Sequence, residues 1–383
     1  MLGHHACLMA DAGHQVRIVA GRGKQTDPRI PFIHLPLADS RHPDILAVKA
    51  ELDAGQVPPA FSELVDSLTA HLREALDGVD VLIAHNVCSL NKNLALTAAV
   101  RNLINDLRVI LWHHDLAWTT PRYQSELYEG YPWDLLRQSW NGVKQVTISE
   151  MRQQELTELM QIDEEDVEVI PNGVDAAAFH KLEAQTKEYV KTLDLLNASP
   201  LFLLPVRITP RKNIELALRV CANLLQHFPD TKLVVTGPLG PHNPANVIYF
   251  EMLEALRKEL KLEHAAHFLA ELTTDYIPDE VIFDFYHLAD ALFLPSREEG
   301  FGIPVLEAGL AGLPIFCSDI PPLRSLGGTR VTYFSADADP LELANRIASH
   351  LSLNSVFRMR TEVRRRYIWE NIYTRDIEPL LRG

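Results

Sequence analysis

Short apolar runs alternate with helical stretches along the whole chain, and this alternation limits the possible folds more than any other feature. In the first half, such runs occupy 16–20, 32–37, 80–86, 108–115, 145–149 and 167–175. After a polar connection at 176–198 the alternation restarts, with runs at 201–207, 232–237, 266–272, 291–296 and 313–319. Repeated strand–helix–strand units favour mostly parallel sheets covered on both faces. The sequence therefore predicts an α/β protein with two Rossmann-like domains.

The two ends of the chain complicate this pattern. Residues 2–12 have a helical pattern and precede the first apolar run, whereas a parallel α/β domain ordinarily begins with a strand. The last helical stretch, 360–382, carries several aromatic and apolar residues, so we expect it to pack on another part of the chain. The predicted domains are 1–175, which lacks its first strand and is completed by a helix at 362–383, and 176–361.

The composition narrows the choice of partners and compartment. A net charge of −15 over 383 residues disfavours nucleic acid as a partner. The four cysteines have no paired spacing, which is typical of a reduced, cytoplasmic protein. No apolar run approaches the length of about 18 residues typical of a membrane span. Contact with a membrane surface and the oligomeric state stay open.

Two cations follow the apolar run at 201–206. Arg207 ends this run, and Lys212 lies five residues later at the start of a helical pattern. Ligands of open α/β sheets bind beyond the carboxyl ends of the strands. Two cations beside a helix N-terminus there could bind a diphosphate. The alternative is a pair of ordinary surface cations.

Residues 297–314 follow the apolar run at 291–296 and combine two acids with a glycine-rich turn. Glu299 and Glu307 are eight positions apart, and Gly300 and Gly302 lie between them. Glycines allow the backbone to approach a ligand closely, and a helix start presents N–H groups to anions. Carboxylates in such a crevice can accept hydrogen bonds from sugar or ribose hydroxyls. An acid that complements the helix dipole would explain one of the glutamates, but not both together with the glycines.

In combination, these residues resemble the retaining glycosyltransferases of family 4, which have the GT-B fold. The shared features are the R-x4-K pattern at Arg207 and Lys212 and the E-x7-E pattern at Glu299 and Glu307. The segments 146–150 and 169–175 and the aromatic C-terminal stretch are also similar to the family. The family's first strand and its glycine-rich loop have no counterpart here. The resemblance implies two Rossmann-like domains whose parallel sheets face each other across a cleft.

The resemblance also implies a role for each matching residue of the second half. Arg207 and Lys212 would bind the donor diphosphate, Glu299 the hydroxyls of the transferred sugar, and Glu307 the nucleotide ribose. The turn and the base pocket would add donor-binding residues, namely Gly300, Phe301, Gly302, Ile303 and Gly237. Neither a metal nor another cofactor is implied.

For the first half, the resemblance places a histidine against the donor sugar. His114 matches best, with Asp115 beside it, and His113 is the alternative register. His85 and Asn86 end another apolar run and are candidates for the acceptor side. Each of these histidines could instead be structural.

The predicted function is that of a cytoplasmic hexosyltransferase that retains the anomeric configuration. It would move a hexose from a UDP- or GDP-sugar to a hydroxyl acceptor by a metal-independent front-face reaction. One alternative is a nucleotide-sugar-binding protein without turnover, or an inactive truncated fragment. A sugar-nucleotide epimerase of the same fold is another. The sequence does not distinguish the sugar, the base or the acceptor.

Overall fold

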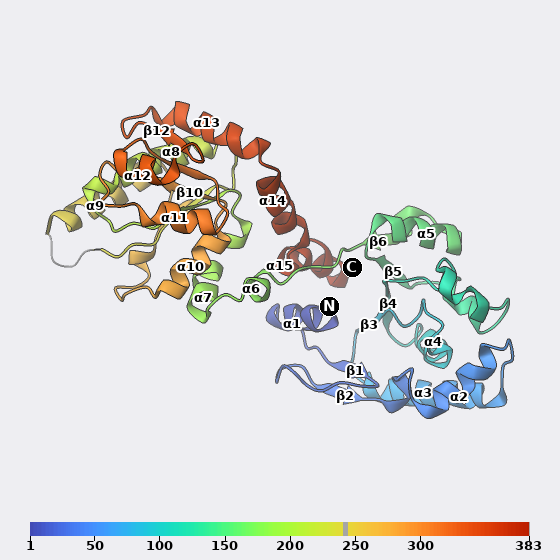
Figure 1. The fold of residues 1–383 in the computed structure, drawn as a ribbon. Helices are drawn as coiled ribbons and strands as arrows, with labels where there is room; N and C mark the ends of the chain where they lie inside the picture. The colour runs from blue at the N-terminus through green and yellow to red at the C-terminus, as the bar shows by residue number, and fades with distance from the viewer. Residues whose placement is uncertain (240–243, 383) are drawn as a thin grey trace. The chain divides into compact units, whose positions relative to one another are not determined.

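A computed structural model describes residues 1–239 and 244–382 of the chain. It divides into two compact units (Figure 1). The N-terminal unit contains Met1–Gly173 and the C-terminal segment that starts at Trp369, and the C-terminal unit contains Val174–Ile368. The sequence prediction placed the two boundaries at 175 and 362.

The N-terminal unit contains two parallel sheets. One consists of β1 (Ile18–Ala20) and β2 (Phe32–His34). The other has the order β3-β4-β5-β6, with β3 (Val81–His85), β4 (Arg108–His113), β5 (Lys144–Thr147) and β6 (Val167–Val169). The larger helices of this unit are α1 (Leu2–Asp11), α2 (Pro43–Leu52), α3 (Pro59–Ala75), α4 (Leu94–Arg101) and α5 (Glu150–Met160).

Apolar spacing and capping explain why these helices form where they do. Helix α3 buries Phe61, Val65 and Leu68, whose spacing of four and three residues places them on one face. This face packs against α4. Helix α5 begins where the Ser149 hydroxyl accepts a hydrogen bond from the Arg152 N–H at 3.3 Å.

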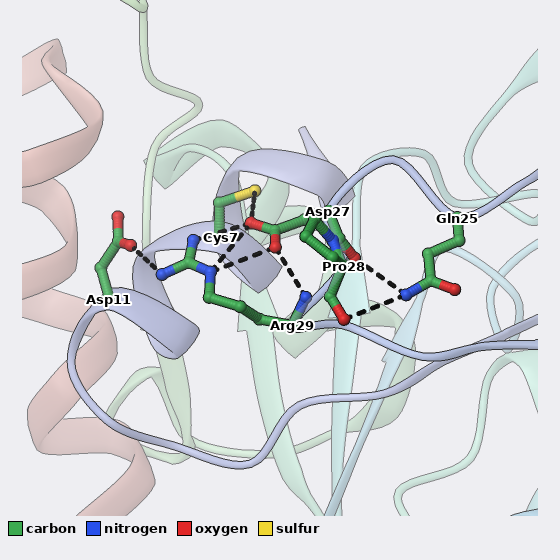
Figure 2. Close-up of polar contacts among 6 residues, drawn as sticks. All are labelled: Cys7, Asp11, Gln25, Asp27, Pro28 and Arg29. Atoms are coloured by element: carbon green, nitrogen blue, oxygen red, sulfur yellow. Dashed lines mark hydrogen bonds and ion pairs between the residues drawn. The ribbon is translucent and has the colours of Figure 1, made fainter.

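Helix α1 is attached to the loop between β1 and β2 by a polar cluster (Figure 2). The Arg29 guanidinium donates to Asp11 at the end of α1 and to Asp27 in the loop, each at 2.7 Å. Hydrogen bonds from Arg29 lower the pKa of Asp27 to about 2. Helix α1, strand β1 and strand β3 line a cavity of about 530 Å³. The cavity therefore lies beside the end strands of both sheets.

The C-terminal segment completes the core of the N-terminal unit. Trp369, Ile372 and Ile377 pack with Ile110 and Trp112 of β4. The prediction of one continuous helix at 362–383 is wrong. Helix α14 (Ser355–Tyr367) ends at an extended residue 368, and α15 (Trp369–Ile372), a π-helical turn (Tyr373–Ile377) and α16 (Glu378–Arg382) follow. The extended residue bridges to residue 174, which interrupts the helix at the boundary between the units.

The C-terminal unit is built on a parallel sheet with the order β12-β11-β10-β7-β8-β9. Its strands are β7 (Leu201–Leu204), β8 (Lys232–Val235), β9 (Ala266–Phe268), β10 (Ala291–Leu294), β11 (Ile315–Ser318) and β12 (Thr332–Phe334). Its helices before α14 are α6 (Ala176–Phe179), α7 (Ala184–Thr192), α8 (Ile214–Leu224), α9 (Pro244–Glu259), α10 (Asp279–Leu288), α11 (Ile303–Leu310), α12 (Pro321–Gly327) and α13 (Pro340–Leu353).

The order of these strands places a topological switch point in the middle of the sheet. The chain enters at β7, adds β8 and β9 on one side, and then returns to β10 on the other side of β7. Every residue of β7 and β10 is buried, as expected for strands with both faces covered. Open α/β sheets bind ligands beyond the carboxyl ends of the strands at such a switch point, which here are the ends of β7 and β10.

Candidate active site

Two loops of the C-terminal unit meet at this switch point. One follows β7 and the other follows β10. The buried Asn213 amide donates to the carbonyl oxygens of Pro295 at 3.1 Å and Ala336 at 2.9 Å. The Arg297 N–H donates to the Arg211 carbonyl oxygen at 2.8 Å. These bonds join the two loops, so Lys212 and Glu299, which are 87 positions apart in the sequence, lie in one site.

Lys212 and Glu299 form an ion pair inside this site. The Lys212 Nζ lies 2.6 Å from Glu299 Oε1, and their side chains are only 9% and 8% exposed. The Ser296 hydroxyl donates to the same oxygen at 2.7 Å. Two donors on one oxygen fix the orientation of the Glu299 carboxylate. Removing one member of a buried pair leaves the other charge uncompensated, which typically costs about 3–5 kcal/mol.

Arg207 is the second predicted cation, and its surroundings differ from those of Lys212. It is exposed, and its guanidinium makes no hydrogen bond or ion pair with the residues that the structure describes. Gly237 packs directly against the backbone of this segment, because a Cβ there would lie 1.8 Å from the Val206 carbonyl oxygen and 2.6 Å from the Arg207 Cα. The structure therefore gives Gly237 a packing role at the ends of β7 and β8.

The glycine-rich turn leads into α11. Gly302 has φ +101°, and a Cβ there would lie 2.6 Å from a methyl group of Leu323. At Gly300 a Cβ would have no neighbour within 4 Å. The side chains of Phe301 and Ile303 are more than half exposed. The turn thus presents the start of α11, where backbone N–H groups favour an anion.

Glu307 lies within α11 and contacts a residue that the sequence analysis missed. The hydroxyl of Tyr286, on α10, donates to Glu307 Oε2 at 2.6 Å. Burial raises the pKa of the Tyr286 phenol, and the hydrogen bond to Glu307 raises it further. The sequence carried no signal for this contact, because Tyr286 looks like one more apolar residue of a buried helix.

In the N-terminal unit the structure brings together the predicted residues at the ends of β3 and β4. Asn86 has φ +52°, and its Oδ1 accepts the backbone N–H groups of His114 at 3.0 Å and Asp115 at 3.2 Å. The Asp115 carboxylate lies 3.7 Å from the guanidinium of Arg152, on α5. Asn86 therefore holds the loop after β4, and part of its hydrogen-bonding capacity is used by the protein.

The histidines of this edge differ in their surroundings. His113 is 1% exposed, and its Nε2 is 2.7 Å from Gln145 Oε1 in the core. His114 is only half-buried. Burial lowers the pKa of His114, and it lowers the pKa of His85 and of His113 to about 4. Of the two candidates for the histidine beside the donor sugar, His114 is thus more accessible than His113. His85 and His113 are neutral at pH 7.

Comparison with known proteins identifies the family. The sequence model of "Glycosyltransferase Family 4" matches residues 3–178, and that of "Glycosyl transferases group 1" matches residues 185–368. Together the two models account for both units of the chain. The chain belongs to the family 4, group 1 glycosyltransferases. The prediction of the family is confirmed, and so is the predicted fold class of two Rossmann-like α/β domains of the GT-B type.

Similar glycosyltransferases include two mannosylglucosylglycerate synthases. The one from Petrotoga mobilis is 27% identical over 77% of this chain and 73% of its own length. The one from Thermotoga maritima is 26% identical over 82% and 77%. A D-inositol 3-phosphate glycosyltransferase from Nocardia farcinica is 28% identical over 47% of this chain and 38% of its own length.

Solved structures with a similar chain include a sucrose-phosphate synthase from Thermosynechococcus elongatus. It is 18% identical, with a TM-score of 0.38 over 100% of this chain and 92% of its own. Within residues 1–239 and 244–382, no helix is long and apolar enough to cross a membrane. The same residues contain no cluster of three or more His, Cys, Asp or Glu side chains arranged to hold a metal ion.

Proposed function

We propose that this glycosyltransferase moves a hexose from a UDP- or GDP-sugar to a hydroxyl acceptor, with retention of the anomeric configuration. The observation that carries the proposal is the buried ion pair of Lys212 and Glu299, which joins the loops after β7 and β10, with Arg207 exposed at the start of the loop after β7. Two cations and a helix start favour a diphosphate there, and a fixed carboxylate beside them favours sugar hydroxyls.

In the proposed reaction, the bond between the anomeric carbon and the diphosphate oxygen breaks as the acceptor oxygen bonds to the same face of the sugar. The departing phosphate oxygen takes the proton of the acceptor hydroxyl. Arg207 and Lys212 stabilise the negative charge that develops on the diphosphate, so the proposal needs no metal ion. Glu299 orients the sugar, and Glu307 binds the nucleotide ribose.

For the N-terminal unit we propose roles on the sugar and acceptor side. His114 would contact the transferred sugar, while His85, Asn86 and Asp115 would contact the acceptor. The neutral state of His85 at pH 7 supports a hydrogen-bonding role rather than a charged one. The name of the two mannosylglucosylglycerate synthases makes mannose the first donor sugar to test. The four cysteines are all free thiols, which supports a cytoplasmic location.

The test is an assay of acceptor-dependent release of nucleoside diphosphate. The purified chain is incubated with UDP-, GDP- or ADP-hexoses, alone and with a panel of hydroxyl acceptors, and the anomeric configuration of the product is read by NMR. The proposal predicts release that requires both a donor and an acceptor, with retained configuration. Donor binding without acceptor-dependent release would indicate a binding protein instead, and interconversion of donor sugars would indicate an epimerase.

A further inference from the structure

A buried tyrosine holds the carboxylate of Glu307. Tyr286 is 3% exposed, and its hydroxyl lies 2.6 Å from Glu307 Oε2. A contact of this length between a hydroxyl and a carboxylate is typical of a charge-assisted hydrogen bond, which is stronger than a neutral one. Among the described residues, the other carboxylate oxygen, Oε1, has no hydrogen-bond partner. Glu307 thus has one oxygen held by the protein and one available to a ligand.

We propose that Tyr286 is a positioning residue that gives the nucleotide site its selectivity for ribose over deoxyribose. It would do so by holding Glu307 so that Oε1 meets a ribose hydroxyl. This inference rests on the proposed function, in which Glu307 binds the ribose of the donor.

The packing of two helices makes the Tyr286 hydroxyl a fixed point. The ring belongs to the main core of the C-terminal unit, together with its neighbours Phe285 and Leu288 on α10. Helix α11 is fixed in the same core by Val305 and Ala308, on either side of Glu307. Because burial raises the pKa of the phenol, Tyr286 remains a hydrogen-bond donor throughout the physiological range.

Glu307 itself is less constrained by packing. It is half-buried, and its neighbour Leu306 is 43% exposed. A glutamate that is free to rotate must be ordered each time a ligand binds, and this ordering opposes binding. The hydrogen bond from Tyr286 orders the side chain before the nucleotide arrives. A fixed carboxylate oxygen then loses its partner when the ligand lacks the hydroxyl, which is how polar sites discriminate strongly.

The test compares nucleotide selectivity in three variants of the full chain. Calorimetry gives Kd for the nucleoside diphosphate that binds best and for its 2′-deoxy and 3′-deoxy analogues. The variants are Tyr286→Phe, Glu307→Gln and the matched control Tyr189→Phe. Tyr189 is also a buried tyrosine of this unit, and its hydroxyl accepts a bond from Gln185 at 2.7 Å.

We expect the wild-type chain to prefer the ribonucleotide over at least one deoxy analogue by about tenfold or more, as for one hydrogen bond to a charged group. Tyr286→Phe should weaken binding of the ribonucleotide about five- to tenfold and leave binding of that analogue unchanged, so the preference collapses. A merely structural effect would weaken both ligands equally. Tyr189→Phe should change neither. If Tyr286→Phe does not fold, Tyr286→Met fills similar space without a hydroxyl and gives the same readout.

The outcomes that overturn the inference differ from those that overturn the proposed function. If Glu307→Gln loses the preference and Tyr286→Phe keeps it, Glu307 binds the ribose without help from Tyr286. If both variants keep the preference while the nucleotide still binds, the ribose lies elsewhere and the inference fails, but the diphosphate site stands. If no nucleotide binds to the folded wild-type chain, the proposed function itself is wrong.

Discussion

At the scale of single residues, the two units use burial in different ways. In the C-terminal unit a lysine and a glutamate are buried as a pair, with Lys212 Nζ 2.6 Å from Glu299 Oε1. In the N-terminal unit, burial acts on single histidines and favours their neutral form. His113 is the clearest case, because it is 1% exposed and burial lowers its pKa to about 4. Charged His113 would need solvation that the core does not offer.

The lowered pKa of His113 makes the stability of the N-terminal unit depend on pH. The pKa of His113 is about 4 in the folded chain and 6.5 as the ordinary value, so the unfolded chain binds the proton more tightly. The contribution of neutral His113 to the stability of the folded unit is complete above about pH 6.5 and is lost as the pH falls toward 4. At pH 5 the contribution of this residue should have fallen by about 2 kcal/mol.

His113→Gln tests this, because glutamine does not titrate. Urea unfolding at pH 7.5 and pH 5 should show that the variant loses about 2 kcal/mol less than the wild type between the two values. His14→Gln, at an exposed position, is the control. An equal pH dependence in the wild type and in His113→Gln would contradict the account.

At the scale of elements, one turn sets the position of the candidate anion site. Gly302 directly precedes α11, and its φ of +101° is a conformation that other residues rarely adopt. Close packing on Leu323 adds a second constraint. The start of α11 is therefore located by backbone conformation and by contact with α12 together.

Gly302→Ala should disturb this turn. Backbone strain and the clash with Leu323 should cost about 1–3 kcal/mol of unfolding free energy and weaken nucleotide binding. Gly309→Ala is the matched control in the same helix, because a Cβ there meets nothing within 4 Å. That control should be neutral or stabilise by up to about 1 kcal/mol. Urea unfolding gives the free energy of unfolding of both variants, and titration gives their nucleotide Kd. If both quantities are the same in the two variants, the conformation of Gly302 does not set the position of the turn.

The sequence predicted the elements better than the contacts between them. Apolar runs located β7 and β10, although both strands end earlier than the runs, since Pro205 and Pro295 follow directly. Strand β12 was missed because it has only 3 residues, and helix α2 was missed although its buried residues Ile45, Val48 and Leu52 have a helical spacing. The interruption at residue 368 was also missed, because only a tertiary bridge to residue 174 reveals it.

In the candidate site, too, the sequence predicted individual residues better than the contacts between them. The motif residues could be found because each follows an apolar run, where a parallel sheet places its ligand sites. The contacts that these residues make could not be found in this way. Lys212 pairs with Glu299, Ser296 donates to the same carboxylate, and Tyr286 donates to Glu307 across 21 positions. A contact between two helices depends on packing, and no single sequence pattern encodes it.

At the scale of the whole molecule, the chain crosses between its two units twice, at residues 173/174 and 368/369. Trp369 is 4% exposed and stacks on His4 of α1 with ring centroids 5.5 Å apart. Gly173 lies against the same ring, because a Cβ there would be 2.4 Å away. This tryptophan thus ties both crossing points to the core of the N-terminal unit.

Trp369→Ala should destabilise the N-terminal unit alone. Loss of a buried tryptophan should cost this unit about 3–5 kcal/mol. The residues proposed to bind the nucleotide lie in the other unit, so nucleotide affinity without denaturant should stay within about twofold. Phe179→Ala, at a position 74% exposed, is the control and should change little. Urea unfolding measures the stability, and titration measures the nucleotide affinity. A loss of binding free energy as large as the loss of unfolding free energy would show that nucleotide binding depends on the N-terminal unit.

The central claim is that the C-terminal unit binds the diphosphate of a sugar donor. The most direct test is a calorimetric titration of the purified chain with UDP, GDP and ADP. Arg207→Ala is the preferred variant. A Lys212 variant would leave the buried Glu299 unpaired, so a loss of nucleotide binding could not be separated from a loss of stability. Arg219→Ala, an exposed arginine on α8, is the control. We expect that one nucleotide binds, that Arg207→Ala weakens its binding at least about tenfold, and that Arg219→Ala does not. Binding that Arg207→Ala leaves unchanged, or no binding at all by the folded chain, would contradict the central claim.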